Sequence, residues 1–306
     1  MRNHRLLRSA FISLLAASAL TGLVPAAASA APTVRPGMDG CDEPYDTRET
    51  VMTVGQRLNP GDKLTNPTDV TELVMQADGN LVLYALGNPG GPKLPLWHSA
   101  TWGNPGAYAT LQEDGNFVVY KQGGSAQTGG GIWHTATYGD RTDTRPRAFL
   151  EADGDFRVIG RKDDPTFGLH WRALKTEKTT KLCAEDATHQ YRYQYGGDWS
   201  QSATVWMVVQ DDNNLVIYRK RDGKAIWNSG TYGSGFHSIE LRMEPDGEML
   251  LRDWFSPNKV VWRSGTAGNP GAYALLQDDG NFVVYKADGG PDKGGALWQS
   301  GTYDKV

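Results

Sequence analysis

The chain has 306 residues, a formal net charge of −4 and two cysteines. This mildly acidic balance gives no general electrostatic reason to bind the phosphate backbone of a nucleic acid, so no nucleic-acid partner is expected. The sequence contains no grouping of Ser, Cys or carboxylate residues at a catalytic spacing, so we predict that the protein is not an enzyme.

The N-terminus has the signature of a secretory signal peptide. Three arginines within the first eight residues precede an apolar run over residues 10–24, and Ala28-Ser29-Ala30 follows. The apolar run is too short for a confident membrane span. We therefore expect cleavage after Ala30 and a secreted, extracellular protein, with residues 1–30 as the signal peptide and residues 31–50 as an N-terminal linker.

A short segment built around Asp-Gly or Asp-Asn recurs six times along the chain. Four copies read Q-x-D-x-N-x-V-x-Y and cover residues 76–84, 112–120, 210–218 and 277–285. The other two copies, residues 151–159 and 244–252, keep the Asp at the third position and little else. We number the copies one to six in chain order. A unit repeated in this way indicates a repeat architecture.

The spacing of the copies divides the chain into two halves. The motif starts are separated by 36, 39, 59, 34 and 33 residues, and the long third gap separates two sets of three copies. Residues 103–110 (GNPGAYAT) also match residues 268–275 (GNPGAYAL), which suggests duplication of a module that was already repetitive. We predict a first domain over residues 51–174, a linker over 175–187 and a second domain over 188–306. A tryptophan follows 17 to 21 residues after the start of every copy: Trp97, Trp133, Trp171, Trp227, Trp262 and Trp298.

Each unit is interpreted as a β-hairpin. In copy one, Asp78-Gly79 lies between two runs rich in Val, Leu and Tyr, which is the strongest short-range hairpin signal. Gly79 suits a turn that needs a positive φ, and Asn213 in copy four can adopt the same conformation. Alternation along the second strand predicts that its leucines face inward, while the Val and Tyr of the motif face the other way.

The two divergent copies separate the turn from the rest of the motif. Both keep the Asp-Gly turn but lose the Gln, Asn and Tyr, so the hairpin does not require those residues. The Gln, Asp, Asn and Tyr supply donors and acceptors around a small apolar Val. Sugars need this combination because vicinal hydroxyls both donate and accept hydrogen bonds. The alternative, that these groups only satisfy one another on a solvated face, stays open at this point.

The motif resembles the mannose-binding signature of the bulb-type lectins, the monocot mannose-binding family, and the chain resembles a secreted bacterial member with two tandem domains. The resemblance covers residues 51–174 and 188–306, and residues 54–64 (VGQRLNPGDKL) look like the first strand of that family. It implies an all-β fold of two tandem β-prism II domains, each with three four-stranded antiparallel sheets in pseudo-threefold symmetry. It also implies that Trp97, Trp133 and Trp171 fill one prism axis and Trp227, Trp262 and Trp298 the other.

The same resemblance implies which residues bind sugar. In each complete copy the Gln, Asp, Asn and Tyr would hydrogen-bond a mannose-like sugar, with the Val against its ring. These residues are Gln76, Asp78, Asn80, Val82, Tyr84, Gln112, Asp114, Asn116, Val118, Tyr120, Gln210, Asp212, Asn214, Val216, Tyr218, Gln277, Asp279, Asn281, Val283 and Tyr285. Copy three has Arg157 in place of Val, and copy five has Leu250 and Arg252 in place of Val and Tyr. We therefore predict four sites of a possible six.

The cysteines are candidates for a disulfide, and the histidines are candidates for metal ligands. Cys41 and Cys183 both remain after cleavage, and an even pair in an oxidising compartment predicts a disulfide, with two distant thiols as the alternative. His98, His134 and His170 each adjoin a repeat tryptophan and lack partners at a metal-ligand spacing, so we interpret them as structural or surface residues. We expect no metal and no cofactor.

These features together predict a secreted, non-catalytic lectin whose partners are mannose-type glycans or polysaccharides. The alternative is a lectin-like bacteriocin that binds surface polysaccharide of related bacteria and kills them. An enzyme with lectin modules is excluded by length, because two prisms use the whole chain. No membrane span is expected after cleavage. The resemblance also raises a homodimer formed by strand exchange through residues 296–303.

Overall fold

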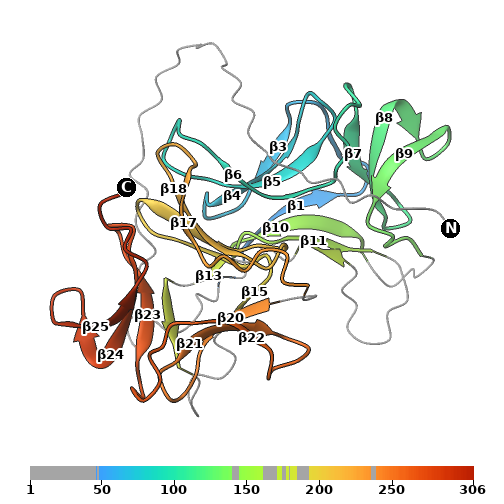
Figure 1. The fold of residues 1–306 in the computed structure, drawn as a ribbon. Coiled ribbons are helices and arrows are strands. Elements are labelled where there is room, and N and C mark those ends of the chain that lie inside the picture. The colour runs from blue at the N-terminus through green and yellow to red at the C-terminus, as the bar shows by residue number, and fades with distance from the viewer. Residues whose placement is uncertain are drawn as a thin grey trace. The chain divides into compact units, whose positions relative to one another are not determined.

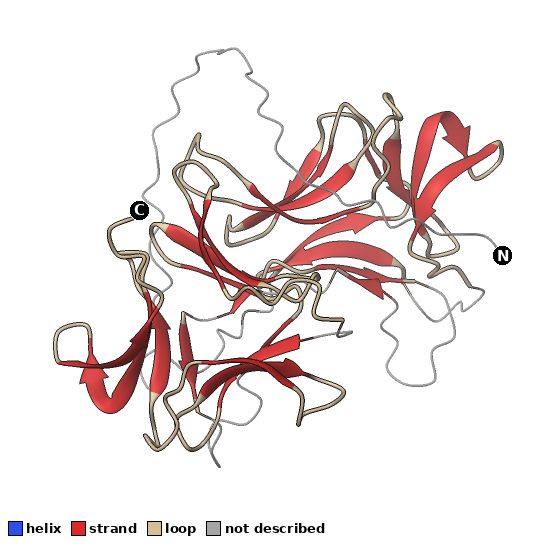
Figure 2. Ribbon diagram, viewed as in Figure 1, coloured by secondary structure: helices blue, strands red, loops and turns tan. Residues whose placement is uncertain are grey.

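A computed structural model describes residues 46, 48–139, 145–160, 171–173, 177–178, 180–184, 193–235 and 239–306. The expected signal peptide, Cys41 and His170 lie outside this part of the chain. Within it the regular structure consists of strands β1 to β25, joined by the loops and turns that Figure 2 shows. The predicted all-β class is confirmed.

The first three motif copies form three antiparallel four-stranded sheets (Figure 1). The hairpin of each copy supplies the two central strands of its sheet. Copy one lies in the sheet β3 (Lys63–Thr65), β4 (Thr71–Met75), β5 (Leu81–Ala85) and β6 (Leu94–His98). Copy two lies in β2 (Arg57–Leu58), β7 (Tyr108–Leu111), β8 (Phe117–Ser125) and β9 (Gly129–His134). Copy three lies in β1 (Glu49–Thr53), β10 (Arg147–Glu151), β11 (Phe156–Ile159) and β12 (Trp171–Arg172).

The last three copies repeat this plan with one addition. Copy four lies in the sheet β13 (Glu177–Lys178), β16 (Trp199–Gln201), β17 (Val205–Val209), β18 (Leu215–Arg219) and β19 (Ala225–Asn228). Copy five lies in β15 (Tyr193–Tyr195), β20 (Ile239–Met243), β21 (Met249–Asp253) and β22 (Val260–Arg263). Copy six lies in β14 (Lys181–Cys183), β23 (Tyr273–Leu276), β24 (Phe282–Gly290) and β25 (Gly294–Gln299). The addition is β13, a fifth strand that pairs in parallel with β16. The fold is thus two tandem β-prism II units.

Three short leading strands open each set, and they join its sheets in reverse order. In the first set β1 pairs with the hairpin of copy three, β2 with that of copy two and β3 with that of copy one. In the second set β14, β15 and β16 pair with copies six, five and four in the same way. The first strand of each set therefore completes the sheet of its last hairpin.

The segment over residues 175–187, expected as a linker, contains two paired strands, β13 and the leading strand β14. β13 and β14 both bond to strands of the second set. Each has only two or three residues, so hydrophobic alternation is too short to reveal it. Cys183 is buried in β14. The disulfide with Cys41 stays a prediction because Cys41 lies outside the described residues.

The hairpin turns have the predicted backbone conformation. Gly79 has φ +93° and Asn213 has φ 73°. A Cβ added at Gly79 would lie 2.1 Å from the backbone oxygen of Asn104, so the turn needs glycine for space as well as for its φ. Leu81 and Leu83 are fully buried in the core of their set, as the alternation predicts.

The six repeat tryptophans meet in two groups of three. The rings of Trp97, Trp133 and Trp171 pack edge to face at 5.2–5.4 Å between centroids. Those of Trp227, Trp262 and Trp298 do so at 5.2–6.2 Å. The predicted central packing is confirmed. The tryptophans are half-buried, however, and the fully buried aromatic side chains beside them are Phe117, Phe156 and Phe282.

Candidate functional site

The four complete motif copies share one set of hydrogen bonds. The side chain of each Asp accepts a bond from the backbone N–H of the motif Asn, at 2.9 Å in copies one, two and six and 3.0 Å in copy four. Each Gln amide donates to the Tyr hydroxyl, at 2.6 Å in copies one and two, 2.7 Å in copy four and 3.0 Å in copy six. The structure therefore brings the predicted residues of each copy together.

The motif Asn uses its carbonyl oxygen to hold a neighbouring loop. Asn80 Oδ1 accepts bonds from Ser99 Oγ at 3.2 Å and from the backbone N–H of Thr101 at 3.1 Å. The Thr101 hydroxyl in turn donates to the backbone oxygen of Gly79 at 2.7 Å. The same bonds recur at Asn116, Asn214 and Asn281. One half of the Asn amide is thus structural in every complete copy.

The groups that remain form a mixed set of donors and acceptors. In copies one, two and four, no described group accepts a hydrogen bond from the Asn Nδ2. The second Asp oxygen, the Gln carbonyl oxygen and the Tyr proton likewise have no partner among the described residues of copy one. The internal hydrogen bonds therefore hold these side chains in place and leave their remaining donors and acceptors available. The motif Val side chains are only 2–4% exposed, so the apolar surface they offer is small.

The environment raises the pKa of three of the motif tyrosines, Tyr84, Tyr120 and Tyr218. Burial raises the pKa of Tyr84 above its usual value of 10.0, against a lowering effect of the hydrogen bond from Gln76. Burial likewise raises the pKa of Tyr120 and Tyr218. The hydroxyls of these three residues stay available as donors at neutral pH.

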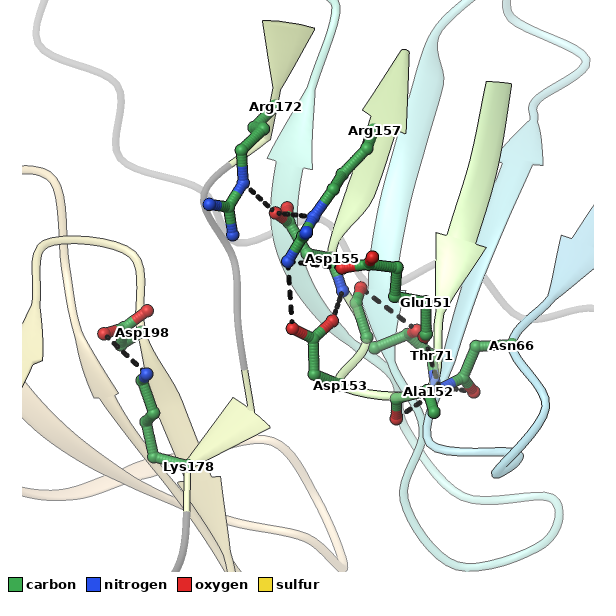
Figure 3. Close-up of polar contacts among 11 residues, drawn as sticks. Asn66, Thr71, Glu151, Ala152, Asp153, Asp155, Arg157, Arg172, Lys178 and Asp198 are labelled. Carbon is green, nitrogen blue, oxygen red and sulfur yellow. Dashed lines mark hydrogen bonds and ion pairs between the residues drawn. The ribbon is translucent and has the colours of Figure 1, made fainter. Parts of the chain in front are cut away.

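Copy three fills the equivalent space with an ion-pair network (Figure 3). Arg157 stands where the complete copies have Val, and it pairs with Glu151 and, at 3.2 Å, with both Asp153 and Asp155. Arg172 reaches Asp155 from the next strand at 2.8 Å. Asp155 is fully buried. The charged side chains of this copy therefore form ion pairs with one another.

Copy five shows that the two halves of the Asn amide have separate roles. Glu248 stands in place of the Asn, and one of its carboxylate oxygens accepts bonds from Ser264 Oγ at 2.9 Å and from the backbone N–H of Thr266 at 3.0 Å. A carboxylate thus preserves the loop, but it has no N–H to donate. Arg252, in place of the Tyr, pairs with Glu240 and Glu244. The complete copies keep an amide that the fold does not need.

One position lies directly across from the motif Val, a placement that the sequence did not reveal when it led us to interpret His98 and His134 as structural or surface residues. It is the residue after each repeat tryptophan: His98, His134, Asn228 and Gln299 in the complete copies. The two histidines accept a bond from a backbone N–H at 3.1 Å through Nδ1, which leaves Nε2 facing away from that contact. Gln299 instead accepts a bond from Asn281 Nδ2 at 3.0 Å. In copy six the protein itself therefore engages the Asn donor.

The described residues contain no group of three or more His, Cys, Asp or Glu side chains arranged to hold a metal ion. They also contain no helix long and apolar enough to cross a bilayer.

No protein-family model matches the chain. Parts of it are similar to plant lectins. Mannose-specific lectin 2 of Colocasia esculenta is 34% identical over 109 residues, which is 35% of this chain and 36% of that one. Mannose-specific lectin TAR1 of the same plant is 31% identical over 132 residues, 42% of this chain and 53% of that one. The matches thus span about a third to a half of these relatives' length.

Solved structures of lectins also match. Monomeric monocot mannose-binding lectins from Gastrodia elata are 28% identical, with 40% of this chain and 98% of that chain covered and a TM-score of 0.32. The agglutinin of Scilla campanulata, a fetuin-binding two-domain lectin, is 22% identical, with 82% and 96% covered and a TM-score of 0.32.

Proposed function

We propose that this chain, a relative of the bulb-type mannose-binding lectins, is a secreted, non-catalytic lectin for mannose or a mannose-like sugar. The observation that supports it most directly is the divided role of the motif Asn. Its carbonyl holds the loop, while its amide is kept in the four complete copies and lost in copy five, where Glu248 meets the structural need alone. Selection for the fold alone does not explain that amide.

Copies one, two and four would each hold the sugar by four hydrogen-bonding groups, and in copy six Gln299 competes for one of the four, the Asn Nδ2. The Asn Nδ2 and the Tyr hydroxyl donate, and the second Asp oxygen and the Gln carbonyl oxygen accept. Adjacent hydroxyls of a pyranose both donate and accept, so they match this set. Sites of this kind are weak for one sugar, on the order of millimolar, and several on one chain gain roughly 10²–10⁴ in avidity on a glycan-coated surface.

Titration calorimetry of the full chain tests this proposal. With methyl α-mannoside as the ligand we expect saturable binding by copies one, two and four and weaker binding by copy six. Galactose at the same concentrations serves as the control for non-specific heat. A folded protein that binds neither mannoside nor any other sugar of a glycan array would refute the proposal.

Gln299 is expected to weaken copy six, and its replacement tests this. In Gln299→His the residue matches copies one and two, and Asn281 Nδ2 becomes available to ligand. One gained hydrogen bond corresponds to roughly a threefold to tenfold higher affinity at that copy. The effect is measured by NMR titration of the Asn281 side-chain amide with methyl α-mannoside. The matched change Arg263→His, at the equivalent place in copy five, should leave binding unchanged. An unaltered titration of Asn281 in Gln299→His would contradict this assignment.

A further inference from the structure

Four exposed aromatic side chains occupy one equivalent place in the repeats. Trp102, Tyr138, Tyr232 and Tyr303 are 50%, 56%, 71% and 58% exposed, and each follows the Thr that bonds to the motif Asn. We call these four residues the rim aromatics. They make up half of the large exposed hydrophobic residues in the described part of the chain. An arrangement that recurs four times is not explained by chance exposure of single residues.

The rim aromatics occur in the same copies as the complete motif. Copy five keeps the Thr and its bonds, with Thr266 N–H donating to Glu248 at 3.0 Å, but has Ala267 at the next position. Copy three has Thr176 at the corresponding distance from its tryptophan. The loop therefore does not need an aromatic residue. The aromatic residue is present only in the copies that carry the complete Gln, Asp, Asn and Tyr motif.

The backbone places each rim aromatic at the edge of its motif site. Thr101 donates hydrogen bonds to Asn80 Oδ1 and to the backbone oxygen of Gly79. Trp102 directly follows Thr101, so these two bonds hold it beside the motif. The Trp102 ring packs edge to face on His98 at 5.4 Å, and His98 pairs with Val82 across the sheet. In copy two, Tyr138 lies 6.5 Å from His134 in the same way.

The motif site lacks what a rim aromatic supplies. Its polar groups can hold the hydroxyls of one sugar, but its Val is nearly buried and offers little apolar surface. A second sugar linked to the first would extend beyond the polar groups and over the rim. An exposed aromatic ring presents a flat apolar face with a negative quadrupole, which suits the C–H groups of a pyranose.

We propose that the rim aromatics form a second subsite, which receives the neighbouring pyranose of an oligosaccharide whose end unit lies in the motif site. This inference rests on the proposed lectin function. It adds to that function a higher affinity for an oligosaccharide than for a single sugar. Trp102 has the largest ring of the four, so copy one gains the most from a second sugar.

The test compares one sugar with two in Trp102→Ala. The other complete copies are silenced by Asn116→Asp, Asn214→Asp and Asn281→Asp, and the ligands are methyl α-mannoside and mannobioses of different linkage. Loss of the ring should weaken binding of the preferred mannobiose about fivefold to tenfold. Binding of methyl α-mannoside should change less than twofold. Trp102→Phe should retain most of the mannobiose affinity.

Trp254→Ala is the matched control, because Trp254 is also an exposed tryptophan and follows the motif of copy five by two residues. It should leave both affinities unchanged. Equal weakening of both ligands in Trp102→Ala, or no weakening of either, would overturn the second subsite and leave the lectin function standing. Failure of the parent protein to bind either ligand would overturn both proposals. Thermal melting confirms that each variant is folded.

Discussion

A variant that carries Asn→Asp at residues 80, 116, 214 and 281 is expected to stay folded and to bind methyl α-mannoside roughly tenfold to 100-fold more weakly at each copy. The retained carboxylate oxygen can still accept the bonds from the loop Ser and Thr, as Glu248 does in copy five. The amide donor, however, becomes an acceptor that opposes a sugar hydroxyl and adds negative charge. Calorimetry measures the affinity, and circular dichroism with thermal melting measures the fold.

Two comparisons make this result specific. Glu248→Gln, at the equivalent position of copy five, should change neither melting temperature nor affinity by much, because that copy lacks the motif Gln, Val and Tyr. The single variants should each remove about one equivalent of ligand. Unimpaired binding by the quadruple variant would show that the Asn amide does not contact sugar, and the assigned donor set would be wrong.

The second large effect concerns stability. Arg157→Ala is expected to destabilise the first set of sheets by about 3 kcal/mol at pH 7. Its side chain is only 17% exposed and pairs with three carboxylates, one of them the fully buried Asp155. Removing it leaves these negative charges close together, although Arg172 still pairs with Asp155. Urea unfolding of the variant and the parent protein measures the difference.

The penalty of Arg157→Ala should shrink at acid pH. Burial raises the pKa of Glu151 above its usual 4.5, Arg157 lowers it, and Asp153 and Asp155 raise it. Removing the arginine raises this pKa further. A carboxyl with a raised pKa costs stability above that pKa, and the cost disappears as pH falls and the group binds its proton. The difference between the proteins should therefore be smaller at about pH 4 than at pH 7.

A variant in which the three carboxylates are neutral separates the effect of charge repulsion on stability from the effect of lost side-chain packing. In Glu151→Gln with Asp153→Asn and Asp155→Asn, the further change Arg157→Ala should cost much less than in the parent protein. A full penalty in that background would attribute the effect to lost packing of the arginine stem. If packing of the stem were the cause, Arg157→Met in the parent protein, which keeps most of the stem, would be as stable as the parent.

Local signals in the sequence accounted for the hairpins and their number. Asp78-Gly79 and its counterparts predicted the turns, and the long gap between copies three and four predicted the two sets of sheets. The pairing of the leading strands could not be predicted in the same way. β2 has two residues and β14 has three, which is too short for a hydrophobic period, so their register depends on contacts with distant hairpins.

The site was predictable as a list of residues but not as a division of roles. The motif letters identify Asn80 and its partners, yet they do not show which oxygen or nitrogen is already used by the loop. Gln299 and Trp102 were missed because each is a single residue outside the nine-residue pattern. A useful signal was available, since the residue after the Thr is aromatic in the four complete copies and Ala267 in copy five.

The reversed order of the leading strands constrains when each half of the protein can fold. β1 reaches its place only when β10 exists, and these strands pair Glu49 with Glu151. During synthesis from the N-terminus, β1 to β3 leave the ribosome before any of the hairpins that they join. Each set therefore has unpaired strand edges until its last hairpin emerges, and such edges are open to pairing with other chains. Slow translation or truncation before residue 151 would expose this state, and a chaperone bound to the unpaired edges would suppress it.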